Sequence, residues 1–279
     1  MRRVVVFPAP FGPRKPNISP FRTVMSTPAT ASTVRLRALK TRRSPCVSIA
    51  LVSTRTFWRI RRRDTLSPPM TSTFRGWPEE FQRFFIGLEL DNSKRYFDAN
   101  RQTYEEAVKG PMVALIDSLD AKYGPGKVFR PNRDVRFSKD KTPYKTNIAG
   151  YAGMGGHGGY LSLNARGLTV AAGRYELTPQ QLNKYQKKVA ADSTGAALAA
   201  IVARLEKAGY GIGGEALKRV PAGLPQDHPR ARLLRHKVLY IHKDFGLHPW
   251  LGSSAARKHI VKVWSDAEPL NDWLQRNAG

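Results

Sequence analysis

The chain of 279 residues is poor in cysteine and in long apolar runs. Its single cysteine, Cys46, excludes an internal disulfide, and its six histidines lack the spacing of the common zinc sites. No stretch approaches 18 consecutive apolar residues, so the sequence predicts no transmembrane helix. We therefore expect a cytoplasmic protein with no membrane partner, no bound metal and no cofactor, in which the histidines have surface or structural roles.

Motifs of the common hydrolases and nucleotide-binding proteins are also missing. The chain has neither the G-x-S-x-G turn of serine hydrolases nor the G-x-x-x-x-G-K-[ST] phosphate loop. Residues 153–158 match G-x-G-x-x-G, but a dinucleotide site requires a helix to follow, and residues 160–163 have the pattern of a strand. We therefore interpret this glycine cluster as a hairpin tip, or as a flap that closes over a neighbouring site.

Acidic residues are unevenly distributed, which divides the chain into two parts. Overall, 47 basic and 21 acidic residues give a formal net charge of +26. The first 63 residues contain 15 basic residues and no acid, so residues 1–64 carry +14 and the remaining 215 residues carry +12. This break in composition argues against a uniformly basic nucleic-acid-binding protein.

Residues 1–69 contain nine of the 20 prolines and 15 serines or threonines, which predicts a disordered basic extension. Three interpretations fit. In the first, translation of the working protein starts at Met70, and the extension is not part of it. Alternatively, the extension is an arm that binds nucleic acid non-specifically through phosphate charge. The third interpretation is an organelle transit peptide, although the prolines disfavour the amphipathic helix that such peptides form.

Residues 70–279 have the periodicity of a single α+β domain. Apolar spacing and capping residues predict helices, whereas short alternating runs bounded by turn residues predict strands. The expected helices cover residues 78–88, 93–108, 112–119, 178–189, 193–205, 254–264 and 269–276, and the expected strands cover residues 128–137, 146–154, 159–163, 168–172 and 237–242. This order predicts a central, mainly antiparallel sheet flanked by N-terminal and C-terminal helices.

The densest polar segment, residues 130–145, is the candidate site. On the predicted strand, Asp134 and Arg136 share one face, while Val135 and Phe137 share the other. The segment has two acids and six basic residues, which are Arg130, Arg133, Arg136, Lys139, Lys141 and Lys145. These six side chains are the predicted contacts of a small anionic ligand that bears phosphate or carboxylate.

Two other interpretations of residues 130–145 remain open. In the first, the protein is an enzyme that acts on a phosphorylated or nucleic-acid substrate, with Asp134 or Asp140 as the base and Tyr144 positioning the substrate. In the second, the segment is a solvated hairpin whose charges pair with one another. The residues alone do not decide between a binding protein and an enzyme.

Three runs of residues within 74–276 resemble the domain of unknown function family numbered 2461, found in bacteria and fungi. They are residues 91–100 followed by Tyr104, residues 133–145, and residues 173–175 ahead of Thr178. The family often has Trp where Tyr96 stands here. The resemblance implies a single cytoplasmic α+β domain and supplies no catalytic residues. It does not reach residues 1–69, which favours the interpretation that this extension is dispensable.

Overall fold

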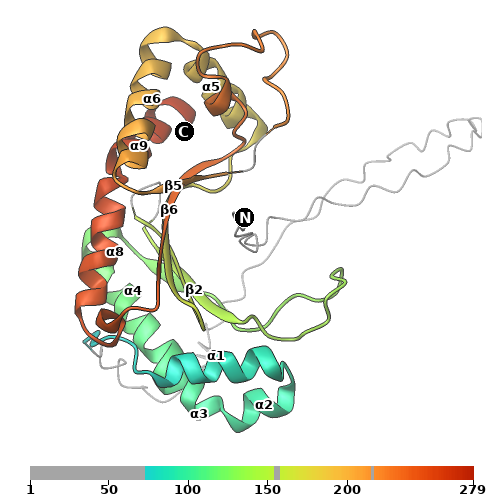
Figure 1. Ribbon diagram of the computed structural model, residues 1–279, viewed down its shortest axis with the longest axis vertical. Coiled ribbons are helices and arrows are strands. Elements are labelled where there is room, and N and C mark those ends of the chain that lie inside the picture. Colours follow the sequence, from blue (N-terminus) through green and yellow to red (C-terminus); the bar gives the residue numbers. More distant parts are fainter. Residues whose placement is uncertain (1–72, 154–157, 215–216) are drawn as a thin grey trace, which may run out of the picture. The chain divides into compact units, whose positions relative to one another are not determined.

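The computed structural model of the protein describes residues 73–153, 158–214 and 217–279 (Figure 1). The predictions for residues 1–69 and for residues 154–157 of the glycine cluster fall outside the described residues and stay predictions. The strands on either side of that cluster pair in register, with Ala152 opposite Gly159.

A six-stranded antiparallel sheet forms the centre of the fold, in the order β1-β2-β3-β4-β6-β5. The strands are β1 (Gly126–Val128), β2 (Asn147–Ala152), β3 (Gly159–Asn164), β4 (Gly167–Arg174), β5 (Gly211–Gly213) and β6 (Leu239–Gly246). The predicted α+β class with an antiparallel sheet is confirmed. Sequence periodicity missed β5, because a three-residue strand containing two glycines has no alternating pattern.

Helices precede, interrupt and follow the sheet. The N-terminal group is α1 (Glu80–Leu90), α2 (Lys94–Ala99), α3 (Arg101–Thr103), the π-helix η1 (Tyr104–Lys109) and α4 (Gly110–Tyr123). The others are α5 (Pro179–Ala190), α6 (Asp192–Lys207), α7 (Ala231–Leu234), the 3₁₀-helix η2 (Pro249–Gly252), α8 (Ala255–Asp266) and α9 (Glu268–Ala278). The helices predicted to start at residues 93 and 178 do begin there: the Ser93 hydroxyl accepts from the Tyr96 N–H, and Thr178 forms a capping box with Gln181.

Helices α4 and α8 pack on the same face of the sheet (Figure 1). A Cβ atom built at Gly126 would lie 2.5 Å from a methyl carbon of Ile116, and one built at Gly159 would lie 2.5 Å from Nε1 of Trp264. The glycines therefore let both helices approach the strands closely. On this face, Leu161 is fully buried in the core.

The second face of the sheet has a different composition. Alternation along the strands places Tyr151 and Tyr160 directly opposite each other on this face, followed across the sheet by Ala171 and His242. None of the described helices packs against β2 and β3 on this side (Figure 1). The two tyrosines are half-buried, whereas their neighbours Ala152 and Leu161, which face the helices, are buried in the core.

The strand predicted over residues 128–137 is wrong, because β1 ends at Val128. Residues 130–145 leave the sheet as a long loop, drawn in green at the right of Figure 1 and closed at its base by a single bridge between Asn132 and Tyr144. Pro131 and Pro143 have no N–H to donate to a ladder. Beyond them, the Asp134 carboxylate accepts from the Arg136 N–H at 3.3 Å, which favours a turn over a strand.

The helices predicted over residues 93–108 and 112–119 were expected to be separated at Gly110 and Pro111, and this break is also wrong. The chain continues from η1 directly into α4, and the Gly110 N–H donates to the carbonyl of Glu105. Pro111 stands in the first turn of α4, where a missing N–H costs little. The helix predicted over residues 93–108 is in fact α2, α3 and η1, and the one predicted to begin at Ser193 or Thr194 begins at Asp192.

Candidate functional site

A pocket of about 410 Å³ lies between the N-terminal helices and the base of the 130–145 loop. Helices α2, α3 and η1 form one wall, and the segment that leaves β1 forms the other. We call it the aromatic–cationic pocket; its lining residues are Phe97, Arg101, Tyr104, Glu105, Lys109, Val128, Phe129, Arg130, Pro131, Asn132 and Tyr144. A π-helix such as η1 is rare and frequently marks a functional site.

Tyr144 joins the two walls of the pocket. Its ring stacks on that of Phe97, with centroids 4.1 Å apart and planes 8° apart. Its backbone N–H donates to the Asn92 side-chain oxygen at 2.9 Å, and its carbonyl accepts from the Asn92 amide at 3.1 Å. Two of the sequence runs that carry the family resemblance, residues 91–100 and 133–145, therefore meet at this pocket.

Two tyrosine hydroxyls in the pocket lack hydrogen-bond partners among the described residues. Tyr104 is 3% exposed and Tyr144 is 6% exposed, and both line the pocket. Burial raises the pKa of Tyr104, with a smaller contribution from the nearby Glu105 carboxylate, so this hydroxyl stays protonated at neutral pH. Neither hydroxyl is among the described polar atoms that are closed to solvent and unpaired, so both can donate to a ligand with acceptor atoms that enters the pocket.

The cations of the pocket differ in how they are paired. Arg101 donates to Asp98 at 2.5 Å, and Lys109 donates to Glu105 at 2.7 Å. Arg130 is exposed and has no acidic partner among the described residues. An anion could approach this guanidinium without displacing a carboxylate.

A second cation, Lys145, lies beside Arg130. Its ammonium donates to the Arg130 carbonyl at 2.9 Å. Burial lowers the pKa of Lys145, and repulsion from Arg130 lowers it further. Two neighbouring positive charges would both be stabilised by a bound anion.

The remaining predicted site residues lie along the loop beyond its base. Arg133 pairs with Asp140, and the Arg136 Nε donates to Asp134 at 2.8 Å. The Lys141 ammonium donates to the Val135 carbonyl at 3.0 Å. Lys139 is exposed. The structure thus brings Arg130, Tyr144 and Lys145 together at the base of the loop, while Arg133, Arg136, Lys139 and Lys141 are further out.

The surroundings of Asp140 stabilise its ionised carboxylate. It accepts from the Thr142 N–H at 2.9 Å and from the Thr142 hydroxyl at 2.7 Å. These two bonds, followed by the Arg133 guanidinium, lower the pKa of Asp140 from 3.8 to about 2. A carboxylate with so low a pKa is a weak proton acceptor at neutral pH.

Sequence reasoning missed part of this pocket. The helical spacing of Phe97 and Tyr104 predicts core residues, and both are in the core, but they also line the pocket; Arg101 and Lys109 were not singled out. The aromatic residues recur at helical spacing, as core residues do, so only the position of the loop distinguishes them.

Other kinds of site are not found in the described part of the chain. Residues 73–153, 158–214 and 217–279 contain no group of three or more His, Cys, Asp or Glu side chains that could hold a metal ion. Within the same ranges, no helix has the length and apolar character needed to cross a bilayer.

Comparison with known proteins gives one match. The profile of the family described as "Conserved hypothetical protein (DUF2461)" matches residues 80–273. The chain belongs to this family. No curated protein and no solved structure matches it. All residues that line the aromatic–cationic pocket fall within the range matched by the DUF2461 profile.

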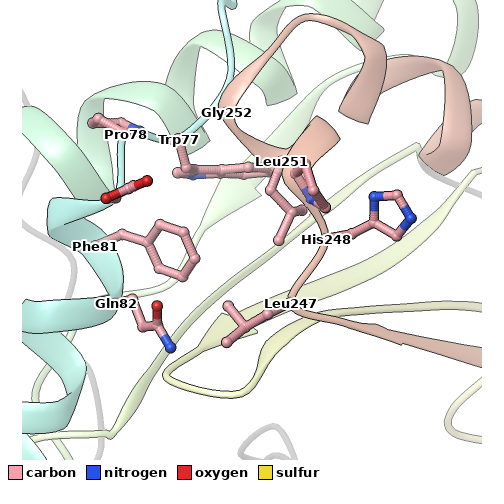
Figure 2. A pocket seen from close by; sticks show the side chains of 10 residues that line it. Trp77, Pro78, Phe81, Gln82, Leu247, His248, Leu251 and Gly252 are labelled. Atoms are coloured by element: carbon pink, nitrogen blue, oxygen red, sulfur yellow. The ribbon is translucent and has the colours of Figure 1, made fainter.

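A second cavity, of about 540 Å³, begins outside the DUF2461 match, at Trp77 (Figure 2). In Figure 2 the Trp77 indole and the Phe81 ring lie on one side and Leu247 and Leu251 on the other. The Trp77 Nε1 is closed to solvent, and the Gln82 amide already donates to a backbone carbonyl at 3.3 Å. None of the predicted site residues lines this cavity, so we base the candidate site on the first pocket.

Proposed function

We propose that this DUF2461 protein binds a small anionic ligand, bearing phosphate or carboxylate, in the aromatic–cationic pocket. The observation that carries the proposal is that Tyr104 and Tyr144, whose hydroxyls have no hydrogen-bond partner among the described residues, line the same pocket as Arg130, whose guanidinium has no acidic partner among them. An anion placed there would accept bonds from neutral and charged donors at once. A volume of about 410 Å³ suits a small molecule.

The proposal assigns different roles to the six predicted anion contacts. Arg130, which lines the pocket, contacts the ligand, and Lys145 beside it attracts the ligand through its charge. Arg133 and Arg136 hold the loop in shape, because each already pairs with an aspartate of the loop. Lys139 and Lys141 belong to the outer loop, the part of the 130–145 loop beyond its base, and attract the anionic ligand at long range.

Catalysis by the loop aspartates is not part of the proposal. The low pKa of Asp140 makes it a weak base, and Asp134 is engaged by the Arg136 side chain. Tyr144 keeps its proposed role of positioning the bound molecule, through its hydroxyl. We also infer that the protein works in the cytoplasm, since its single cysteine suits a reducing compartment.

Ligand-induced thermal stabilisation tests the proposal. We expect millimolar inorganic phosphate, and more strongly a panel of phosphorylated metabolites, to raise the Tm of the full chain. Arg130→Met and Tyr144→Phe should each reduce that rise, because one removes the free charge and the other removes a donor. Arg166→Met is the matched control, as Arg166 is an exposed arginine in the turn between β3 and β4.

The outcomes separate the pocket from general charge effects. An equal reduction in Arg166→Met would mean that phosphate acts through net charge alone. An unchanged rise in both Arg130→Met and Tyr144→Phe would place the anion elsewhere and overturn the proposal.

A further inference from the structure

Three aromatic rings extend from the aromatic–cationic pocket across the second face of the sheet. Phe129 lines the pocket, and its ring centroid lies 5.9 Å from that of Tyr151 and 6.4 Å from that of Tyr160. Tyr151 and Tyr160 stand directly opposite each other on β2 and β3. We call Phe129, Tyr151 and Tyr160 the aromatic row.

The aromatic row lies on the sheet face that none of the described helices packs against (Figure 1). All three residues are half-buried, so part of each stays accessible. On the helix-covered face, by contrast, residues at equivalent depth are leucines and other aliphatic residues with no exposure. The second face carries smaller residues such as Ala149, Ser162 and Ala171 beside the two tyrosines, so the aromatic row is the part of it that can offer π-faces to a ligand.

Cations accompany the row. Lys127 is exposed and pairs in register with Tyr151, which places it on the same face. The Lys145 ammonium lies 5.8 Å from the centroid of the Phe129 ring. Among the described residues of this face, Asp244 supplies an acid, but it stands opposite Thr169, three strands from Tyr151. The end of the sheet that carries the row is positively charged.

We propose that the aromatic row binds single-stranded nucleic acid. Aromatic rings beside cations fit a polyanion whose planar bases are free to stack, and each stacked base contributes roughly 1–3 kcal/mol. A duplex fits less well, because its bases are already stacked inside the helix. The aromatic row contains none of the basic residues 1–69. That extension would attract any nucleic acid through charge alone, with no stacking on aromatic rings. The row also does not require the small-ligand site, although Phe129 belongs to both.

The test measures fluorescence anisotropy of a fluorescein-labelled oligothymidylate of about twelve nucleotides with the full chain. We expect Tyr151→Leu, which keeps a large apolar side chain but removes the π-face, to weaken binding about tenfold. Phe137→Leu is the matched control: Phe137 is 92% exposed on the outer loop and is not part of the row. Circular dichroism and Tm establish that both variants stay folded.

Salt dependence gives a second readout that a general loss of stability would not produce. Lys127→Met should reduce the slope of log K against log salt by about 0.7, the value for one phosphate contact to a single strand. An unlabelled single strand should compete for the protein better than a duplex of the same length.

Several results would overturn this inference. They are no binding of the oligothymidylate, equal losses in Tyr151→Leu and Phe137→Leu, or unchanged affinity in both Tyr151→Leu and Lys127→Met. The last result would mean that binding occurs through charge outside the sheet. These outcomes are independent of the phosphate experiment, in which Arg130→Met is decisive and Tyr151 is not involved.

Discussion

The side chain of Asn92 hydrogen-bonds both backbone groups of Tyr144, its N–H and its carbonyl. The Asn92 side-chain oxygen accepts from the Tyr144 N–H at 2.9 Å, and its amide donates to the Tyr144 carbonyl at 3.1 Å. A strand partner would satisfy the same two groups. Asn92 thus replaces a neighbouring strand at the base of the 130–145 loop, and it comes from the segment between α1 and α2, 52 residues earlier in the chain.

Replacing Asn92 by Ala should therefore release the loop. Two hydrogen bonds at about 1 kcal/mol each predict a loss of about 1–2 kcal/mol in the free energy of unfolding. Urea denaturation measures this loss. Brief trypsin treatment followed by mass spectrometry should show faster cleavage after Lys139 and Lys141. Asn92→Asp, which can still accept from the N–H, should lose less; equal losses in the two variants would contradict this account.

Arg230 is predicted to contribute more to stability than its neighbour Asp192. Its Nε donates to the Val189 carbonyl at 2.7 Å, and an Nη donates to the Ala190 carbonyl at 2.8 Å, which satisfies the C-terminal end of α5. The Arg230 side chain is 12% exposed, whereas that of Asp192 is fully exposed. Arg230→Met should cost roughly 2–3 kcal/mol and Asp192→Asn less than about 0.5 kcal/mol, measured by urea denaturation. Similar costs would show that the ion pair, and not the cap, stabilises this corner.

Elements with strong local signals could be predicted from the sequence. The Thr178-Pro179 start of α5 and the glycine stop after α6 depend on groups within a few residues of each other. The two central hairpin strands, β3 and β4, are joined by a short turn that ends at Gly167, with φ 115°. In these places local chemistry and the final fold agree, so periodicity was sufficient.

The 130–145 loop could not be predicted in the same way. Its apolar residues alternate as in a strand, but Pro131 and Pro143 remove the donors that a ladder needs. Its position depends on Asn92 and Phe97, which are distant in sequence, and no local pattern encodes such contacts. For the same reason, charged residues of the loop were identified from the sequence, whereas the second role of the core residues Phe97 and Tyr104, as one wall of the pocket, was not.

The charge of Asp140 should make the loop sensitive to acid. Its pKa is about 2 in the folded protein, against an ordinary value of 3.8. A lowered pKa means that the carboxylate stabilises the fold fully above pH 3.8, and that this contribution is lost as the pH falls from 3.8 to about 2. Carboxyl NMR titration should show the low pKa directly. Thr142→Val, which removes the hydroxyl donor, and Arg133→Met should each move it back toward 3.8; an unmoved value would rule out these donors as the cause.

Two glycines with positive φ should respond differently to alanine. Gly167 has φ 115°, and a Cβ atom there would lie 1.9 Å from the backbone of Gly246 on β6. Gly209 has φ 82° and nothing within 4 Å of such an atom. Gly209→Ala should cost about 1–2 kcal/mol from backbone strain alone. Gly167→Ala adds a steric clash with a strand that cannot move without disturbing the β4–β6 pairing, so it should cost about 3 kcal/mol or more. Urea denaturation of both variants measures the difference. Equal costs would mean that β4 and β6 separate easily at this end of their pairing.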